Sequence, residues 1–128
     1  AGAVTAARRG NAARLAGVAA EEVAARWYEA RGGVIEARNW RARREDGGGE
    51  IDLVVRRSDA LIFVEVKAGR SARRRDVIRE SQWLRLEKAA LRYIVECETG
   101  DPVDLRFDAA FVGPDGVVSV VENARGMD

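Results

Sequence analysis

The sequence predicts one α/β domain in which a helix, three strands, a helix and two strands follow one another. Two periodicities indicate this class, because apolar residues recur every three or four positions in two long segments and every second position in others. With 128 residues, the chain is long enough for one sizeable core and too short for two. We therefore expect a single domain over residues 11–128, preceded by a flexible segment over residues 1–10.

The first helix is predicted over residues 11–31, a segment without proline that ends at Gly32-Gly33. A strand over residues 34–40 follows it. The polar residues 41–49 are expected to form a loop, because glycine-rich sequence after an aspartate is typical of turns. The first half of the chain therefore leads from a helix into a sheet.

Two strong strand candidates, residues 50–57 and 61–67, come next, and a basic loop over residues 68–75 follows them. The second helix is predicted over residues 76–97. Its expected buried stripe consists of Trp83, Leu86, Ala90, Ile94 and Cys97. The chain is then expected to end in two strands, residues 103–111, where apolar and charged residues alternate, and residues 117–121.

The composition excludes several kinds of chemistry. The chain contains no histidine and a single cysteine, which excludes serine-histidine catalysis, intramolecular disulfides and the usual zinc sites. Catalysis would have to use carboxylates, lysine, arginine or hydroxyl groups, with a hard cation that prefers oxygen ligands. No apolar run is long enough to cross a membrane or to act as a signal peptide, so we expect a cytoplasmic protein.

The predicted hairpin brings acidic residues together. If Ser58-Asp59 is a two-residue turn, Asp52 lies opposite Glu65 and Glu50 lies opposite Lys67. The other face of this hairpin is then wholly apolar and must be covered by a helix. Its expected members are Ile51, Leu53, Val55, Ile62, Val64 and Val66.

Two opposed carboxylates repel one another, and a divalent cation would offset that repulsion. We expect Mg²⁺ or Mn²⁺ to bind Asp52, Glu65 and a backbone carbonyl near Val66. Lys67 would then orient or deprotonate a water, or stabilise charge on a phosphate. The alternative is that Lys67 forms surface salt bridges with Glu50 and Glu65 while Asp52 is solvated. The apolar runs beside these acids, and the retention of only two lysines in an arginine-rich chain, favour the metal site.

These residues resemble a known family. The segments AAEEVAARWYEARGG, ARNWR, GGGEIDLVV, LIFVEVKAGR and RFDAAFV are similar to uncharacterised protein family 0102, the YraN-like proteins, which are predicted nucleases. The resemblance implies a restriction-endonuclease-like core with the order αβββαβ, a mixed central sheet flanked by helices, as in Holliday-junction resolvases. It also implies that Asp52, Glu65 and Lys67 are the catalytic set, with Glu21 and Glu50 as auxiliary acids. Without it, Glu21 would equally fit a solvated helix residue.

Several further residues are candidates for binding nucleic acid. The arginines after the motif, and others before it, could neutralise phosphates without reading sequence, although a solvated charge run is the simpler alternative. The predicted contacts are Arg70, Arg73, Arg74, Arg75, Arg43, Arg44 and Gln82. Trp40 could stack on a base, whereas Trp27 and Trp83 are expected in the core. Arg106 and Asp108 are expected to form an ion pair, and Cys97 to be buried.

Taken together, the sequence predicts a cytoplasmic, Mg²⁺- or Mn²⁺-dependent nuclease that acts on DNA more readily than RNA. Branched DNA and a homodimer follow only from the likeness to resolvases. One alternative is a nucleic-acid-binding module that keeps the fold without turnover. Another is a structural protein whose acids are merely solvated.

Overall fold

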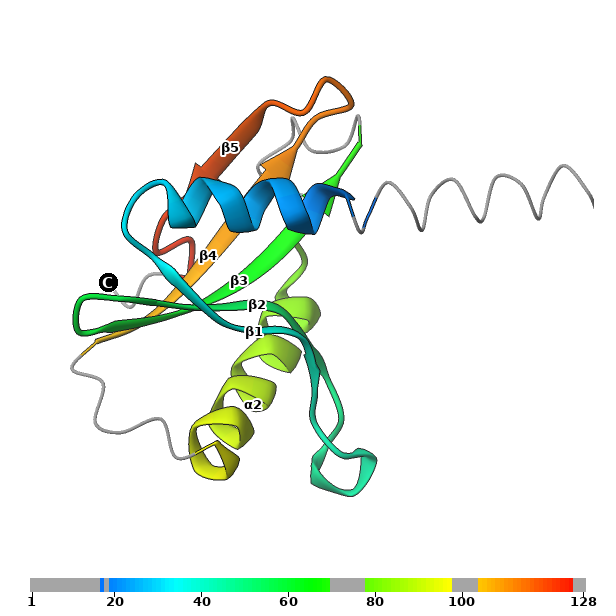
Figure 1. Ribbon diagram of the computed structural model, residues 1–128. Coiled ribbons are helices and arrows are strands. Elements are labelled where there is room, and N and C mark those ends of the chain that lie inside the picture. Colours follow the sequence, from blue (N-terminus) through cyan, green and yellow to red (C-terminus); the bar gives the residue numbers. More distant parts are fainter. Residues whose placement is uncertain (1–16, 18, 70–77, 98–103, 126–128) are drawn as a thin grey trace, which may run out of the picture.

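A computed structural model describes residues 17, 19–69, 78–97 and 104–125 of the chain (Figure 1). The N-terminal helix is described over its helical residues 19–29. The other elements are β1 (Val34–Arg41), η1 (Arg44–Asp46), β2 (Glu50–Arg57), β3 (Ala60–Ala68), α2 (Glu80–Glu96), β4 (Asp104–Val112) and β5 (Val118–Val121). This order confirms the predicted one and adds the short 3₁₀ helix η1. The expected flexible segment over residues 1–10 and the expected helix start at residue 76 lie outside the described residues.

The five strands form one sheet in the order β1-β2-β3-β4-β5. All neighbouring pairs are antiparallel except β3 and β4, which are parallel. A tight turn cannot join parallel neighbours, so the chain crosses one face of the sheet through α2 between β3 and β4. The α/β class and the mixed sheet flanked by helices are therefore confirmed, consistent with a restriction-endonuclease-like core.

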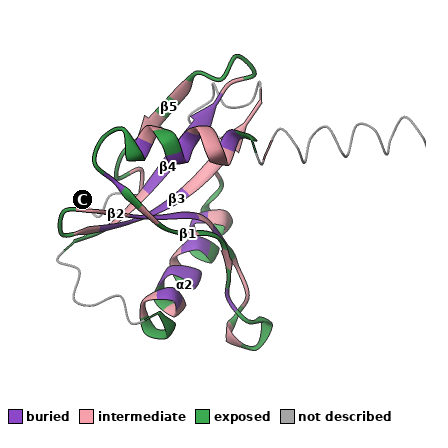
Figure 2. Ribbon diagram, in the orientation of Figure 1, coloured by how far each residue is buried: buried purple, intermediate pink, exposed green. Residues whose placement is uncertain are grey.

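A helix covers each face of the sheet, and each face has its own apolar core (Figures 1 and 2). On one face, Trp83, Leu86 and Tyr93 of α2 pack with Val54, Leu61, Phe63 and Phe111. On the other face, Ala24, Ala25 and Tyr28 of the N-terminal helix pack with Leu53, Val55, Ile62, Val64 and Ala110. Coverage on both faces explains why β2 and β3 read as nearly continuous apolar runs.

The expected apolar face of the β2–β3 hairpin is wrong at one position. Ile51 belongs to the core under α2 together with Val54, and not to the core that contains Leu53. Regular alternation would place Ile51 and Leu53 on the same face, so β2 must rotate near Asp52. Across from this point, Asn39 of β1 has a positive φ of 48°, and β1 also has a register shift between Ile35 and Ala37.

Beyond this irregularity, the end of β1 and the start of β2 bend away from the rest of the sheet (Figure 1). We call residues 42–49, which join these strands, the tip segment. A Cβ atom at Gly49 would stand 3.1 Å from the Arg85 carbonyl oxygen and 3.3 Å from the Ala89 Cβ atom. Gly49 also has a φ of 101°, which favours glycine. A glycine at this position therefore permits the tip segment to rest on α2.

The stripe of α2 is confirmed in part. Trp83, Leu86 and Ala90 are buried, and Ile94 packs against the same core while remaining partly exposed. Cys97, however, is exposed, so the prediction of a buried cysteine is wrong. Cys97 is the C-terminal cap of α2, and Figure 1 shows this end of the helix pointing away from the sheet.

A buried carboxylate joins the N-terminal helix to β4. Asp108 is fully buried and accepts hydrogen bonds from the Tyr28 hydroxyl at 2.7 Å, the Arg106 guanidinium at 2.9 and 3.0 Å, and the Asn123 backbone N–H at 2.9 Å. The predicted Arg106–Asp108 ion pair is thus confirmed. The Asp108 carboxylate also holds the N-terminal helix, through Tyr28, and the turn after β5, through Asn123, against β4.

None of the helices in the described part of the chain combines the length and the apolar character that crossing a membrane requires.

Candidate functional site

Four carboxylates from three segments gather where β2 and β3 stop pairing. Glu21 comes from the N-terminal helix, Glu50 and Asp52 come from β2, and Glu65 comes from β3. Each of Glu21, Asp52 and Glu65 has a pKa raised in part by the charge of other members of this group. We call these four residues the acid cluster. The structure thus brings together the four acidic residues that the sequence assigned to the site.

Asp52 is the most perturbed member of the acid cluster. Burial, followed by the negative charge of Glu65, raises its pKa to about 7. A hydrogen bond from the Val66 N–H to Asp52 Oδ2, at 2.8 Å, acts in the opposite direction, and the charges of Glu21 and Glu50 add to the rise in pKa. This aspartate is therefore not the solvated residue that the simpler alternative required.

The hydrogen bond to Val66 also shows how the hairpin departs from its predicted register. The β2–β3 pairs run from Arg57↔Ala60 to Leu53↔Val64, as a two-residue turn predicts. The predicted pairs of Asp52 with Glu65 and of Glu50 with Lys67 are not part of this ladder. The Asp52 side chain instead accepts from the β3 backbone, because β2 rotates here and its backbone leaves β3.

Glu65 and Lys67 form the second half of the motif. Their side chains are 18% and 22% exposed, and Lys67 Nζ lies 3.5 Å from Glu65 Oε1. Burial raises the pKa of Glu65, Lys67 opposes that rise in pKa, and Glu50 and Glu21 add to it. The alternative salt bridge from Lys67 to Glu50 is not formed, since Glu50 pairs with Arg41 at 3.6 Å. Among the residues that the structure describes, Lys67 therefore has Glu65 as its acidic partner.

Glu21 differs from its neighbour Glu22. Burial raises the pKa of Glu21, a hydrogen bond with Asn39 lowers it, and the charge of Glu50 raises it again. Glu22 instead pairs with Arg38 at 2.5 Å and with Arg26 at 3.8 Å. Only Glu21 therefore takes part in the acid cluster, although the two glutamates are adjacent.

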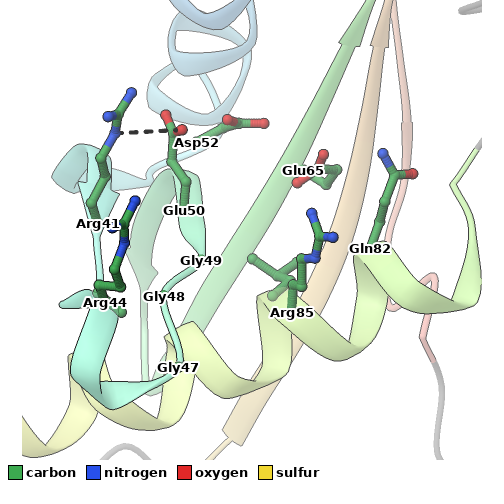
Figure 3. A pocket seen from close by; sticks show the side chains of 12 residues that line it. Arg41, Arg44, Gly47, Gly48, Gly49, Glu50, Asp52, Glu65, Gln82 and Arg85 are labelled. Carbon is green, nitrogen blue, oxygen red and sulfur yellow. Dashed lines mark ion pairs between the residues drawn. The ribbon is translucent and has the colours of Figure 1, made fainter.

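A cavity of about 960 Å³ opens between the acid cluster, the tip segment and α2 (Figure 3). Acidic and basic side chains both line it, and Figure 3 shows Gln82 and Arg85 extending from α2 towards the strands. The lining residues are Arg41, Ala42, Arg44, Gly47, Gly48, Gly49, Glu50, Asp52, Glu65, Gln82, Arg85 and Leu86. The cavity thus combines carboxylates with guanidinium groups, as a site for a phosphate ester and a cation requires.

The predicted nucleic-acid contacts divide into three groups. Arg44 and Gln82 line the cavity, and the Gln82 Oε1 atom accepts from the Arg79 N–H at 3.1 Å, which caps α2. Arg43 is exposed and caps η1 without lining the cavity. Arg70, Arg73, Arg74 and Arg75 lie outside the described residues.

One charged residue of the cavity lining on α2 was not predicted, and Trp40 lies in different surroundings from those expected. Arg85 was not predicted, yet it lies three positions after Gln82 on α2, a spacing that places both on one side of a helix. Trp40, considered as a base-stacking residue, packs edge-on against Tyr93 with ring centroids 5.4 Å apart. It joins the core under α2, as Trp83 does.

The carboxylate oxygens of the site are the kind of ligand that a hard divalent cation prefers. The carboxylates of the described residues do not, however, form a complete set of metal ligands. Among the described residues, no three acidic or cysteine side chains are close enough together to hold a metal ion. Asp52 and Glu65 nevertheless offer partly buried carboxylate oxygens whose repulsion a cation would relieve. Mg²⁺ is commonly held by one or two carboxylates together with water. The predicted Val66 carbonyl ligand stays a prediction, because the contact seen here uses the N–H of that residue.

Comparison with known proteins identifies the family of this chain. The family model described as "Uncharacterised protein family UPF0102" matches residues 20–112, a range that contains the whole acid cluster. The chain is 42% identical over 121 residues to a UPF0102 protein of Ruegeria pomeroyi, covering 94% of this chain and 95% of that protein. It is 39% identical over 116 residues to one of Roseobacter denitrificans, covering 90% and 87%, and 39% identical over 122 residues to one of Azorhizobium caulinodans, covering 94% and 90%. The chain therefore belongs to the uncharacterised protein family UPF0102.

Proposed function

We propose that this protein is a metal-dependent nuclease that hydrolyses phosphodiester bonds at the acid cluster. The observation that carries the proposal is the state of Asp52, whose pKa is raised to about 7 by burial and by surrounding carboxylates. A fold that keeps several acids so close, without pairing each with a base, is well suited to binding a cation. The cavity beside them is lined by the guanidinium groups that a phosphate would need.

In this proposal, Asp52 and Glu65 would hold Mg²⁺ or Mn²⁺, with Glu50 and Glu21 as auxiliary acids. The cation would neutralise charge on the phosphate and lower the pKa of a water molecule. Lys67 opposes the rise in the pKa of Glu65 through their 3.5 Å contact, and its ammonium group is able to donate to a phosphate oxygen as negative charge develops there. Val66 fixes Asp52 through its N–H, so this carboxylate keeps one orientation.

The proposal extends to the substrate, the oligomeric state and the cellular location of the protein. DNA is the first substrate to test, with branched DNA included because of the likeness to resolvases. A homodimer and a cytoplasmic location are expected on the same grounds. The competing function is a nucleic-acid-binding module without turnover, and the observation that favours it is the lack of an assembled three-acid ligand set among the described residues.

Cleavage assays with labelled linear, flapped, four-way and single-stranded substrates test the proposal in Mg²⁺, in Mn²⁺ and in chelator. We expect Asp52→Asn, Glu65→Gln and Lys67→Ala each to lower the rate by a factor on the order of 100 or more. Glu21→Gln should lower it by about tenfold.

Glu22→Gln is the matched control, because Glu22 is the next residue on the same helix and pairs outside the acid cluster. It should retain the rate of the unmodified protein. Binding of the substrates without any metal-dependent cleavage would favour the module without turnover. Cleavage that survives Asp52→Asn would contradict the proposed site.

A further inference from the structure

Two guanidinium groups line the cavity without a carboxylate partner. Arg44 lies on the tip segment and Arg85 lies on α2, and in the part of the chain that the structure describes neither forms an ion pair. Other arginines nearby are paired, since Arg41 contacts Glu50 at 3.6 Å and Arg92 contacts Asp46 at 3.3 Å. An unpaired guanidinium facing a cavity is available for bidentate binding of phosphate oxygens.

The two walls that carry these arginines touch each other. Gly49 of the tip segment lies against the backbone of Arg85 and the side chain of Ala89, and the Arg92–Asp46 ion pair fastens the tip segment one turn further along α2. The cavity lining on α2 ends at Leu86. The tip segment and α2 are therefore in contact on the side of Ala89 and Arg92, so a strand that enters the cavity cannot run on in that direction.

The volume of the cavity limits what can enter it. About 960 Å³ is within the range of pockets that hold small molecules, which is about 300–1,000 Å³. That space suits a few unpaired nucleotides. One turn of B-form duplex is about 34 Å long and broader than its major groove of about 12 Å. It therefore exceeds this volume several times, and we expect it to lie across the opening.

We propose that Arg44 and Arg85 form a phosphate-binding subsite for an unpaired nucleic-acid strand. The strand enters from the side of the acid cluster, and its phosphate is bound between the tip segment and α2 (Figure 3). The neighbouring phosphate of the same strand then lies towards Asp52 and Glu65, a step that rests on the proposed nuclease function. The substrate class is thus a single strand, a flap or a frayed end, of DNA or RNA.

Fluorescence anisotropy with labelled strands of about 12 nucleotides tests the subsite in chelator, where no cleavage occurs. Three probes of one sequence are compared: single-stranded DNA, single-stranded RNA and duplex DNA. Arg44→Gln and Arg85→Gln should each weaken single-strand binding by about 5- to 10-fold. The slope of log affinity against log salt should fall by about 0.7 for each phosphate that a variant no longer binds.

Lys88→Gln is the control, because Lys88 is exposed on α2 three positions after Arg85 and is not part of the cavity lining. It removes the same charge from the same helix and should change single-strand binding less than twofold. Thermal melting of each variant confirms that it is folded. Preference for DNA or for RNA identifies the sugar, and tighter binding of either than of the duplex supports the subsite.

The result that would overturn the inference is an equal weakening of binding in Lys88→Gln and Arg85→Gln, or tighter binding of duplex than of single strand. Its failure is separable from failure of the nuclease proposal. Arginine-dependent strand binding without cleavage in Mg²⁺ or Mn²⁺ leaves the subsite standing and removes the nuclease. Cleavage that depends on Asp52, with single-strand binding unchanged in both arginine variants, supports the nuclease proposal and rules out the subsite.

Discussion

Asp52 and Asp108 are both largely buried aspartates in the same sheet, yet their surroundings are opposite. Asp108 on β4 receives hydrogen bonds from the Tyr28 hydroxyl, the Arg106 guanidinium and the Asn123 N–H. Asp52 on β2 receives one from the Val66 N–H, and its pKa is raised by the charges of Glu65, Glu21 and Glu50. One carboxylate is surrounded by hydrogen-bond donors, whereas the other is crowded by groups of like charge.

The comparison separates a structural acid from a candidate functional one. A buried charge that is fully hydrogen-bonded holds elements together, and removing it leaves its partners unsatisfied. A buried acid among other acids costs stability, and a fold retains such an arrangement most often at a functional site. Substitutions at Asp52 and Asp108 should therefore change stability in opposite directions.

The largest expected effect is the loss of stability in Asp108→Ala. This change removes the acceptor of the Tyr28 hydroxyl and of the Asn123 N–H, and it leaves Arg106 with its 3.6 Å contact to Glu122. The free energy of unfolding should therefore fall by about 3–5 kcal/mol. Urea unfolding followed by circular dichroism measures it. Asp115→Ala is the control, because Asp115 is exposed and accepts a local turn hydrogen bond from Val117, and it should cost about 1 kcal/mol or less. Similar losses in the two variants would show that the Asp108 network does not stabilise the fold.

The second prediction is that Asp52→Asn is more stable than the unmodified protein at about pH 8 in chelator, by an amount on the order of 2 kcal/mol. Because the pKa of Asp52 is about 7 in the folded protein and its ordinary value is 3.8, the folded state binds more protons between these values. Stability contributed by this residue therefore falls as pH rises from 3.8 to about 7. Asparagine keeps the acceptor for the Val66 N–H and removes the charge.

This gain should shrink as the pH is lowered towards about 4, where the Asp52 carboxyl is protonated in the folded protein. Urea unfolding over a series of pH values measures it. A gain that is the same at every pH, or a loss of stability at about pH 8, would show that Asp52 is not crowded by charge.

The smallest predicted effect is stabilisation by metal. At a Mg²⁺ concentration about tenfold above the dissociation constant, binding to the folded protein alone adds about 1.4 kcal/mol. Differential scanning calorimetry should show a higher Tm with Mg²⁺ in the unmodified protein and in Glu22→Gln, and no change in Asp52→Asn. A similar rise in Tm in all three proteins would mean that the ion binds elsewhere.

Much of the fold was predictable because local patterns and global packing agree. The two-residue turn at Ser58-Asp59 and the alternation on either side fixed the β2–β3 register as far as Leu53↔Val64. The apolar runs of β2 and β3 correctly indicated a sheet covered on both faces. The family resemblance supplied Glu21, which the helix pattern could not distinguish from Glu22.

The errors come from features that no periodic pattern encodes. Rotation of β2 near Asp52 moves Ile51 to the other core and takes Asp52 out of the ladder, and regular alternation cannot signal such a bend. The position of Arg85 in the cavity depends on where the tip segment rests, which is a long-range contact through Gly49. Cys97 is exposed because it caps the end of α2 that points away from the sheet.

The hydrogen bond between Tyr28 and Asp108 has a consequence for how the protein is made. Glu21 and Tyr28 share the N-terminal helix, so the contact that secures Tyr28 also sets the place of Glu21. Asp108 lies 80 positions after Tyr28, so it is synthesised after all four members of the acid cluster. A nascent chain therefore contains all four acids well before it acquires the residue that anchors the helix carrying the first of them.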